Sequence, residues 1–118
     1  MLFAMATTVS SPELTRLGQA RELMAQYLGQ QPGGFTQDFD EEEWEALALR
    51  NRPFRRDGAL YVHARAWWNT CVRPLAPEIV YADTIGLLRL LGAKNQRVTL
   101  NKVAHTDRSY WKLPLSFL

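Results

Sequence analysis

The sequence predicts a small α+β domain. Apolar residues recur at helical spacing in several stretches, β-favouring residues form short runs, and turns rich in Gly, Pro and Asp separate them. The chain has 118 residues and is 47% hydrophobic, which suits one domain with a single apolar core and is unlike a disordered chain. We expect residues 1–9 to be flexible and residues 10–118 to form that domain.

The first helix is predicted over residues 10–28. Ser10 is a suitable cap, Pro12 lies in the first turn, and Glu13 stands in the capping-box position. The helix shows an apolar stripe made of Leu14, Leu17, Met24, Tyr27 and Leu28. The polar and Gly-containing residues 30–34 end it.

A second helix is predicted to begin at Asp40 and to end near Arg50. Glu43 completes a capping box with Asp40, and Phe39 and Trp44 are spaced as a hydrophobic staple. The acidic residues 40–45 are expected to be a solvated helix start, because carboxylates in a first turn interact favourably with the helix dipole. The alternative is an acidic patch that faces a partner.

A basic loop over residues 51–58 is predicted to lead into a strand at residues 60–62. A helix follows from Ala64 to Arg73, where Pro74 should end it, and a further helix is predicted from Pro77 to Leu91. The buried stripe of the first of these two helices is Ala64, Trp67, Trp68, Cys71 and Val72. The stripe of the second is Val80, Thr84, Leu87, Leu88 and Leu91.

Two strands are predicted at residues 97–103 and 109–115, joined by the polar loop 104–108. Trp111, Leu113 and Leu115 alternate and should face the core, which would leave Tyr110 facing outward. The order helix, strand, helix, helix, strand, strand is that of a winged helix-turn-helix with a two-stranded wing. The sequence therefore predicts this fold, preceded by an extra N-terminal helix.

The lack of recognisable catalytic motifs argues against an enzyme. The chain has no nucleophile with an adjacent base, no phosphate-binding glycine loop and no dinucleotide fingerprint, so we expect no catalytic residues and no cofactor. A single cysteine allows no internal disulfide, and no Cys/His spacing suits a metal. We expect Cys71 to be a small core residue, His63 to be structural as a helix cap, and His105 to be solvated.

No stretch has the length and apolarity of a membrane span or of a signal peptide, so a cytoplasmic location is expected. The net charge of +2 hides an asymmetry between the two halves of the chain. Residues 1–49 contain two Arg and eight acidic residues, a net charge of −6, whereas residues 50–118 contain twelve Lys or Arg and four acidic residues, a net charge of +8. The basic half suggests a polyanionic partner.

The predicted second helix of the pair is a poor reader of DNA bases. Its outward face offers only Arg89, while Glu78 and Asp83 make the helix net negative. Other cations lie on the hairpin or flank the first helix, namely Lys94, Arg97, Lys102, Arg108, Lys112, Arg65 and Arg73. This distribution predicts backbone contact with little sequence specificity. Four arginines before the strand, Arg50, Arg52, Arg55 and Arg56, could contact phosphate or neutralise the acidic helix.

The C-terminal two-thirds of the chain resembles a known family. The features are residues 51–56 before Tyr61 and Val62, a helix containing Trp67 and Cys71, a Leu-Leu-Gly helix end, and a hairpin closing on residues 108–111. They resemble the C-terminal winged-helix domain of primase-helicase-type ATPases of phages, plasmids and integrative elements. A looser match is the C-terminal domain of conjugative relaxase/helicase proteins. The resemblance implies an accessory domain, without catalysis of its own, that engages DNA during replication or transfer.

Two functions from different classes follow from these observations. The first is a DNA-binding module, for duplex or single-stranded DNA, attached to a helicase, primase or relaxase domain. The second is a protein-interaction or dimerisation module of the same fold that does not bind DNA directly and could form a homodimer. A free-standing repressor is disfavoured because of the poor reading helix.

Overall fold

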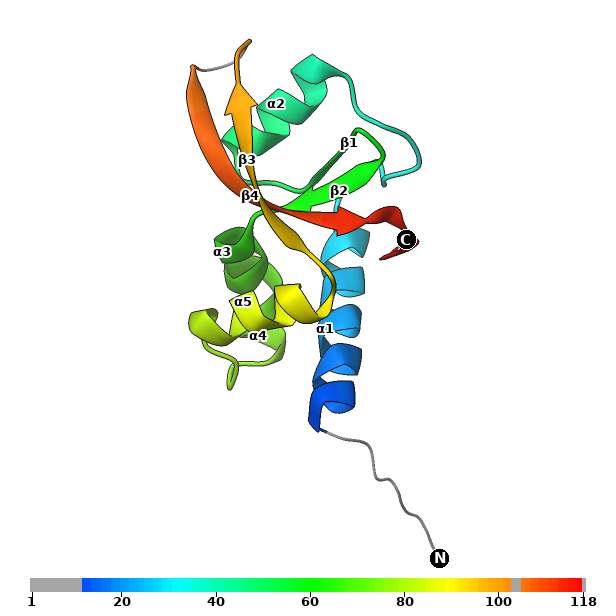
Figure 1. The fold of residues 1–118 in the computed structure, drawn as a ribbon, viewed down its shortest axis with the longest axis vertical. Coiled ribbons are helices and arrows are strands. Elements are labelled where there is room, and N and C mark those ends of the chain that lie inside the picture. Colours follow the sequence, from blue (N-terminus) through cyan, green and yellow to red (C-terminus); the bar gives the residue numbers. More distant parts are fainter. Residues whose placement is uncertain (1–11, 103–104, 118) are drawn as a thin grey trace, which may run out of the picture.

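The computed structural model describes residues 12–102 and 105–117. It contains a four-stranded antiparallel sheet of order β1-β2-β4-β3 together with helices (Figure 1). The helices are α1 (Pro12–Gly29), α2 (Glu41–Leu49), α3 (Ala64–Trp67), α4 (Arg73–Leu75) and α5 (Tyr81–Leu90), with a π-helical turn, Trp68–Val72, between α3 and α4 and a 3-10 turn at Leu115–Phe117. The strands are β1 (Phe54–Arg56), β2 (Ala59–Val62), β3 (Lys94–Leu100) and β4 (Thr106–Pro114). The prediction of an α+β chain is confirmed; the flexible segment 1–9 and the Ser10 cap lie outside the described residues.

The sheet is covered on both faces. One face packs against α1, α3 and α5 through a cluster that includes Trp67, Leu87 and Leu113. The other face packs against α2 through a smaller cluster made of Trp44, Ala48, Phe54, Ala59, Tyr61, Val98, Leu100 and Tyr110. Figure 1 shows α2 at one end of the molecule and α3, α4 and α5 at the other, with the sheet between them. Within the described part of the chain, no helix is both long and apolar enough to cross a membrane.

The prediction that Tyr110 faces outward is wrong. Tyr110 is completely buried beneath α2, and its hydroxyl donates to the carbonyl oxygens of Ala48 at 3.3 Å and Arg52 at 2.9 Å. Successive residues of a strand point to opposite faces, so Trp111 lies in the larger cluster. Both residues are buried because α2 adds a second layer that the element order did not predict.

The helix start at Asp40 is confirmed as a capping box. The Asp40 carboxylate accepts from the Glu43 N–H at 2.8 Å, and the Glu43 carboxylate accepts from the Asp40 N–H at 3.1 Å. The expectation that the whole acidic run is solvated is wrong at Glu45. This side chain is completely buried and accepts a hydrogen bond of 2.7 Å from the backbone N–H of Lys102, which ties α2 to the end of β3.

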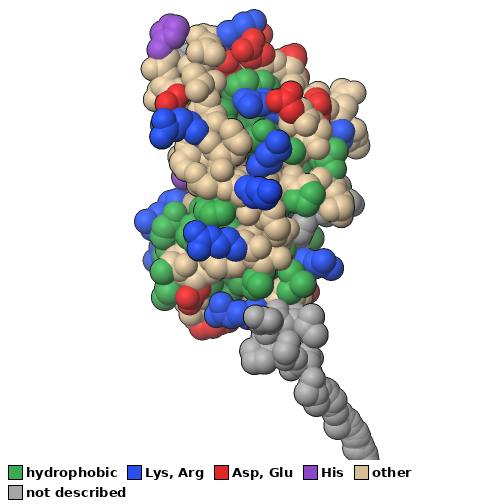
Figure 2. All heavy atoms as spheres, viewed as in Figure 1, with side chains coloured by type: hydrophobic (Ala, Val, Ile, Leu, Met, Phe, Trp, Pro, Cys, Tyr) green, Lys and Arg blue, Asp and Glu red, His purple; other side chains and the backbone are tan. Residues whose placement is uncertain are grey.

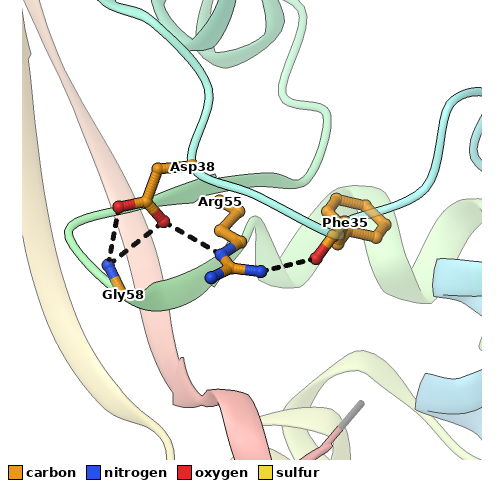
Figure 3. A network of polar contacts seen from close by, with 4 residues as sticks. All are labelled: Phe35, Asp38, Arg55 and Gly58. Carbon is orange, nitrogen blue, oxygen red and sulfur yellow. Dashed lines mark hydrogen bonds and ion pairs between the residues drawn. The ribbon is translucent and has the colours of Figure 1, made fainter.

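The basic segment predicted as a loop contains strand β1. Asp57 and Gly58 have φ angles of 53° and 70°, as a two-residue type I′ hairpin turn requires, and they connect β1 to β2. Figure 3 shows how the hairpin holds the loop before α2. Arg55 pairs with Asp38 at 2.9 Å and donates to the Phe35 carbonyl at 2.9 Å, while the Gly58 N–H contacts the Asp38 carboxylate. Arg55 therefore has a structural role.

Pro74 does not end the helix that begins at Ala64. The chain passes through the π-helical turn and continues as α4, with Pro74 in its first turn. In the π turn the Arg73 N–H bonds to the Trp68 carbonyl, five residues back. We infer that this wider turn relieves the clash that a proline ring makes with the carbonyl four residues before it.

Three other predicted boundaries are displaced. The helix predicted from Pro77 begins at Tyr81, because Val80 is extended and 55% exposed and so does not belong to the buried stripe. The two C-terminal strands begin earlier than predicted, at Lys94 and Thr106. Their first residues are polar and mostly exposed, yet they pair in the ladder, so apolar alternation alone could not reveal them.

Candidate nucleic-acid interface

Two lysines face each other at the base of the β3–β4 hairpin. The register places Lys94 of β3 directly opposite Lys112 of β4, and both side chains are exposed. Directly opposed residues have Cβ atoms only about 4.5–5.5 Å apart, and like charges there are destabilising. Neither ammonium group has an ion-pair partner among residues 12–102 and 105–117. A bound anion would relieve this repulsion.

The opposite face of the same strands carries two more cations. Arg97 of β3 lies opposite Ser109. It is on the face of the sheet that carries Trp111 and packs against α1, α3 and α5. Its side chain is 77% exposed and lies 3.7 Å from Asp107, and an exposed ion pair of this kind is weak. The Arg89 guanidinium, at the end of α5, lies 6.0 Å from the centre of the Trp111 ring.

We call the set Arg89, Lys94, Arg97 and Lys112 the hairpin-base surface. The strand β3 is an edge of the sheet, so these cations surround a free edge from both faces. Figure 2 shows Lys and Arg side chains following one another over the sheet and towards α5 on this side of the molecule. A groove of about 420 Å³ adjoins the two lysines and is also lined by Gly58, Ala59, Gly92 and Pro114, with Asp57 as its acidic residue.

The structure places the other predicted cations elsewhere. Lys102 lies 3.4 Å from Glu41 of α2, and the half-buried Arg108 donates to the Leu49 carbonyl at 3.5 Å. These two side chains contact the segment that covers the sheet. Arg65 and Arg73 lie on the helices at the opposite end. The eight predicted residues therefore divide into one group of four and two pairs.

Arg65 and Arg73 each lie over aromatic rings. The Arg65 guanidinium is 3.8 Å from the centre of the Tyr81 ring, and that of Arg73 is 5.5 Å from the centre of the Trp68 ring. The two rings contact each other edge to face with centroids 6.0 Å apart, and the Trp68 indole donates to the Ile79 carbonyl at 2.9 Å. We call Arg65, Trp68, Arg73 and Tyr81 the arginine–aromatic surface. The sequence pattern assigned Trp68 to the core, against which it does pack while only partly buried, and did not reveal this surface.

The outward face of α5 has few side chains that could form hydrogen bonds with DNA bases. Ala82, Gly86, Arg89 and Leu90 are exposed, whereas Thr84, Leu87 and Leu88 are buried. Arg89 is therefore the only cation that the described helix α5 exposes. This agrees with the expectation of a poor base-reading helix.

Burial shifts the pKa values of several titratable groups in the interior. His63 caps α3, as predicted, because its Nδ1 accepts from the Ala66 N–H at 3.3 Å. Burial, with smaller effects of Arg108 and Arg65, lowers the pKa of His63. Cys71 is buried as predicted, its Sγ lies 3.2 Å from the Leu23 carbonyl oxygen, and burial raises its pKa. Burial also raises the pKa of Tyr27 to about 12.

The His63 cap predicts a pH dependence of stability. Because the pKa of His63 is lower in the folded chain than in the unfolded chain, the unfolded state binds more protons. Its contribution is present above the unfolded pKa, about 6.5, and is lost as the pH falls through the folded pKa. Urea unfolding at a series of pH values should show this loss in the wild type and not in His63→Asn, which keeps a capping acceptor. Identical pH profiles would contradict it.

No three His, Cys, Asp or Glu side chains among the described residues gather as metal ligands would.

Comparisons with protein-family models, curated proteins and solved structures gave no match to this chain. The resemblance to the primase-helicase-associated domain therefore stays a prediction.

Proposed function

We propose that the chain is a non-catalytic winged-helix module that binds DNA, in the cytoplasm, as an accessory part of a mobile-element replication or transfer protein. The observation that carries this proposal is the opposed pair Lys94 and Lys112, which has no acidic partner within the described residues. Arg89 and Arg97 extend the same positive surface around the edge of β3. Such a surface suits a phosphate backbone.

The topology supports this proposal. The segments α1, α3 to α4, and α5 pack on one face of the three strands in the order β2-β4-β3, and the β3–β4 hairpin directly follows α5. A winged helix arranges its three helices, its first strand and its wing in this way. The helix α2 and the strand β1 are then an insertion between the first helix and the first strand.

The proposed mode of binding is contact with phosphates rather than reading of bases. The outer face of α5 lacks Asn and Gln, and its single Arg cannot define a sequence. Lysines contact phosphate as point charges, and each contact releases a counterion. We therefore expect binding that is tolerant of sequence and steeply dependent on salt.

The test is the double variant Lys94→Gln, Lys112→Gln. Its affinity for a short labelled duplex, measured by fluorescence anisotropy at low salt, should fall by about tenfold or more. The slope of log K against log salt should become shallower by about 1.8, which is about 0.9 for each lost phosphate contact. A labelled single strand measured in parallel shows which form of DNA is preferred.

The matched control is Arg16→Gln, Arg21→Gln, which removes the same charge from exposed positions of α1. The control should retain nearly all of the wild-type affinity. If both double variants lose affinity equally, net charge alone explains binding, and the hairpin-base surface is not the site. Absence of binding by the wild type at low salt would refute the proposed function.

A second candidate function is a protein-interaction module. It is favoured by two large aliphatic side chains that are exposed at the α4–α5 end of the molecule, Leu75 at 53% and Val80 at 55%. They flank the loop between α4 and α5, beside the arginine–aromatic surface. The Trp68 indole donates a hydrogen bond to the Ile79 carbonyl of this loop. Trp, Tyr and Arg are the residues most enriched among the energetic centres of protein interfaces.

A further inference from the structure

Two surfaces lie at opposite ends of the molecule (Figure 1) and carry groups that can pair, guanidinium groups on one and carboxylates on the other. One is the arginine–aromatic surface of α3, α4 and α5, and the other is the outer face of α2. We propose that copies of this chain associate through a contact in which α2 of one copy lies on the arginine–aromatic surface of another. This inference is independent of the proposed DNA binding.

The guanidinium groups of Arg65 and Arg73 are ready to bind carboxylates. Cation–π attraction to the Tyr81 and Trp68 rings restrains the two guanidinium groups, whose N–H donors suit a carboxylate. In the described chain neither arginine belongs to an ion pair. The acidic residues of this region, Glu78 in the loop and Asp83 in the first turn of α5, leave it with two cations against two acids.

The π-helical turn places Arg73 on the same side of the helix as Trp68. In a regular α-helix, a residue five positions after Trp68 would point about 140° away from it, because each residue turns the helix by about 100°. The π turn instead bonds the Arg73 N–H to the Trp68 carbonyl, so that Arg73 follows Trp68 on the same side. Arg65 lies one turn before Trp68. This departure from regular helix geometry thus builds the surface.

The outer face of α2 has the matching chemistry. Glu42, Ala46 and Leu49 are exposed at helical spacing, with the carboxylate at one end of the stripe and an aliphatic side chain at the other. Leu49 is 38% exposed. Glu41 and Glu43 add negative charge in the same first turn, although Lys102 and the capping box already bind them.

The two stripes can therefore pair carboxylate with guanidinium and aliphatic with aliphatic. Leu75 and Val80 are exposed within seven residues of Arg73 along the chain, and Leu49 is exposed seven residues after Glu42. The contact cannot form within one copy, because α2 packs on one face of the sheet and α3 to α5 on the other. An interaction between unlike surfaces closes into a dimer or ring, or else forms an open chain, depending on the rotation between copies.

The experiment measures the mass of the wild-type chain by light scattering, without DNA, over a range of concentrations at low and high salt. We expect association that strengthens with concentration and weakens with salt. Arg65→Glu, Arg73→Glu should weaken it by about tenfold or more, and so should Glu42→Lys, Ala46→Lys on the other surface. The control Arg16→Glu, Arg21→Glu, with the same charge change as the first variant, should associate like the wild type.

Mixing the two interface variants is the decisive step. In each variant alone, the α2 surface and the arginine–aromatic surface carry charges of the same sign. In the mixture, the acidic α2 of the Arg65→Glu, Arg73→Glu variant can bind the arginines of the other variant, and the basic α2 of that variant can bind the introduced glutamates. We therefore expect the mixture to associate where neither variant does, with unchanged melting temperatures showing that both are folded.

A mixture that stays monomeric, or a wild type that is monomeric at every concentration, would overturn the proposal and leave the surface to another protein. Because Arg65 and Arg73 lie outside the hairpin-base surface, their variant should still bind DNA. Loss of association with retained DNA binding separates this inference from the proposed function.

Discussion

Replacing Trp67 with alanine is expected to lower the free energy of unfolding by about 3–5 kcal/mol. The Trp67 side chain is completely buried in the cluster between the sheet and the helices α1 and α5, and its indole N–H donates to the Leu23 carbonyl at 3.4 Å. The substitution removes a large apolar contact area and leaves a cavity that the surrounding helices can close only in part. A domain of this size typically has about 5–15 kcal/mol in total, so much of its stability would be lost.

Urea unfolding followed by circular dichroism measures this effect, and Trp68→Ala is the matched comparison. Trp68 is the same residue type at the next position but is only partly buried against the edge of the same cluster, so its loss should cost less, about 1–2 kcal/mol. The proposed self-association, in contrast, should suffer in Trp68→Ala because Arg73 loses the ring over which it lies. Equal destabilisation by the two substitutions would contradict the greater contribution of the fully buried Trp67.

Most of the element order was predictable because most elements bury only one side, although strand β1 was predicted as part of a loop. The apolar stripe of α1 and the capping box at Asp40 depend on short-range chemistry, which the local sequence contains completely. The same is true of the His63 cap and of the burial of Cys71. In each case a residue within four positions along the chain, or one helical face, decides the outcome.

The second layer of the core was not predictable in the same way. Tyr110 and Trp111 are adjacent and both apolar, so a strand with one buried face must expose one of them. The helix α2 covers the second face, and its position depends on long-range contacts such as Glu45 with the Lys102 N–H. The π turn was hidden for a related reason, since the apolar spacing before Pro74 also fits an α-helix.

The candidate site depends on strand register. Lys94 and Lys112 are far apart in the sequence, and only the pairing of β3 with β4 places them opposite each other. Lys102 and Arg108 lie closer together along the chain and were expected on the same surface, yet they contact Glu41 and the Leu49 carbonyl. The composition predicted a basic hairpin. It could not predict that Lys94 and Lys112 have no acidic partner among the described residues while Lys102 and Arg108 contact α2, because that depends on where α2 lies.

Replacing Phe54 with alanine should also cost about 3–5 kcal/mol. Phe54 is completely buried at the centre of the smaller cluster, with its ring centroid 5.5 Å from that of Trp44 and 5.0 Å from those of Tyr61 and Tyr110. Each aromatic pair adds about 0.5–1.5 kcal/mol to the area buried. Urea unfolding measures the loss, and Leu49→Ala, at a partly exposed position of α2, should cost much less.

Native-state hydrogen exchange shows where this loss is felt. Phe54 belongs to the cluster beneath α2, so the amides of α2 and β1 should lose protection first, while those of α1 and α5 remain protected. The pairing of β2, β4 and β3 does not pass through Phe54, so Lys94 and Lys112 should stay opposed and DNA affinity should change by no more than about twofold. A uniform rise in exchange would mean that the two clusters unfold together. In that case α2 supports the hairpin-base surface as well as covering the sheet, and destabilising α2 would weaken DNA binding without touching a single cation.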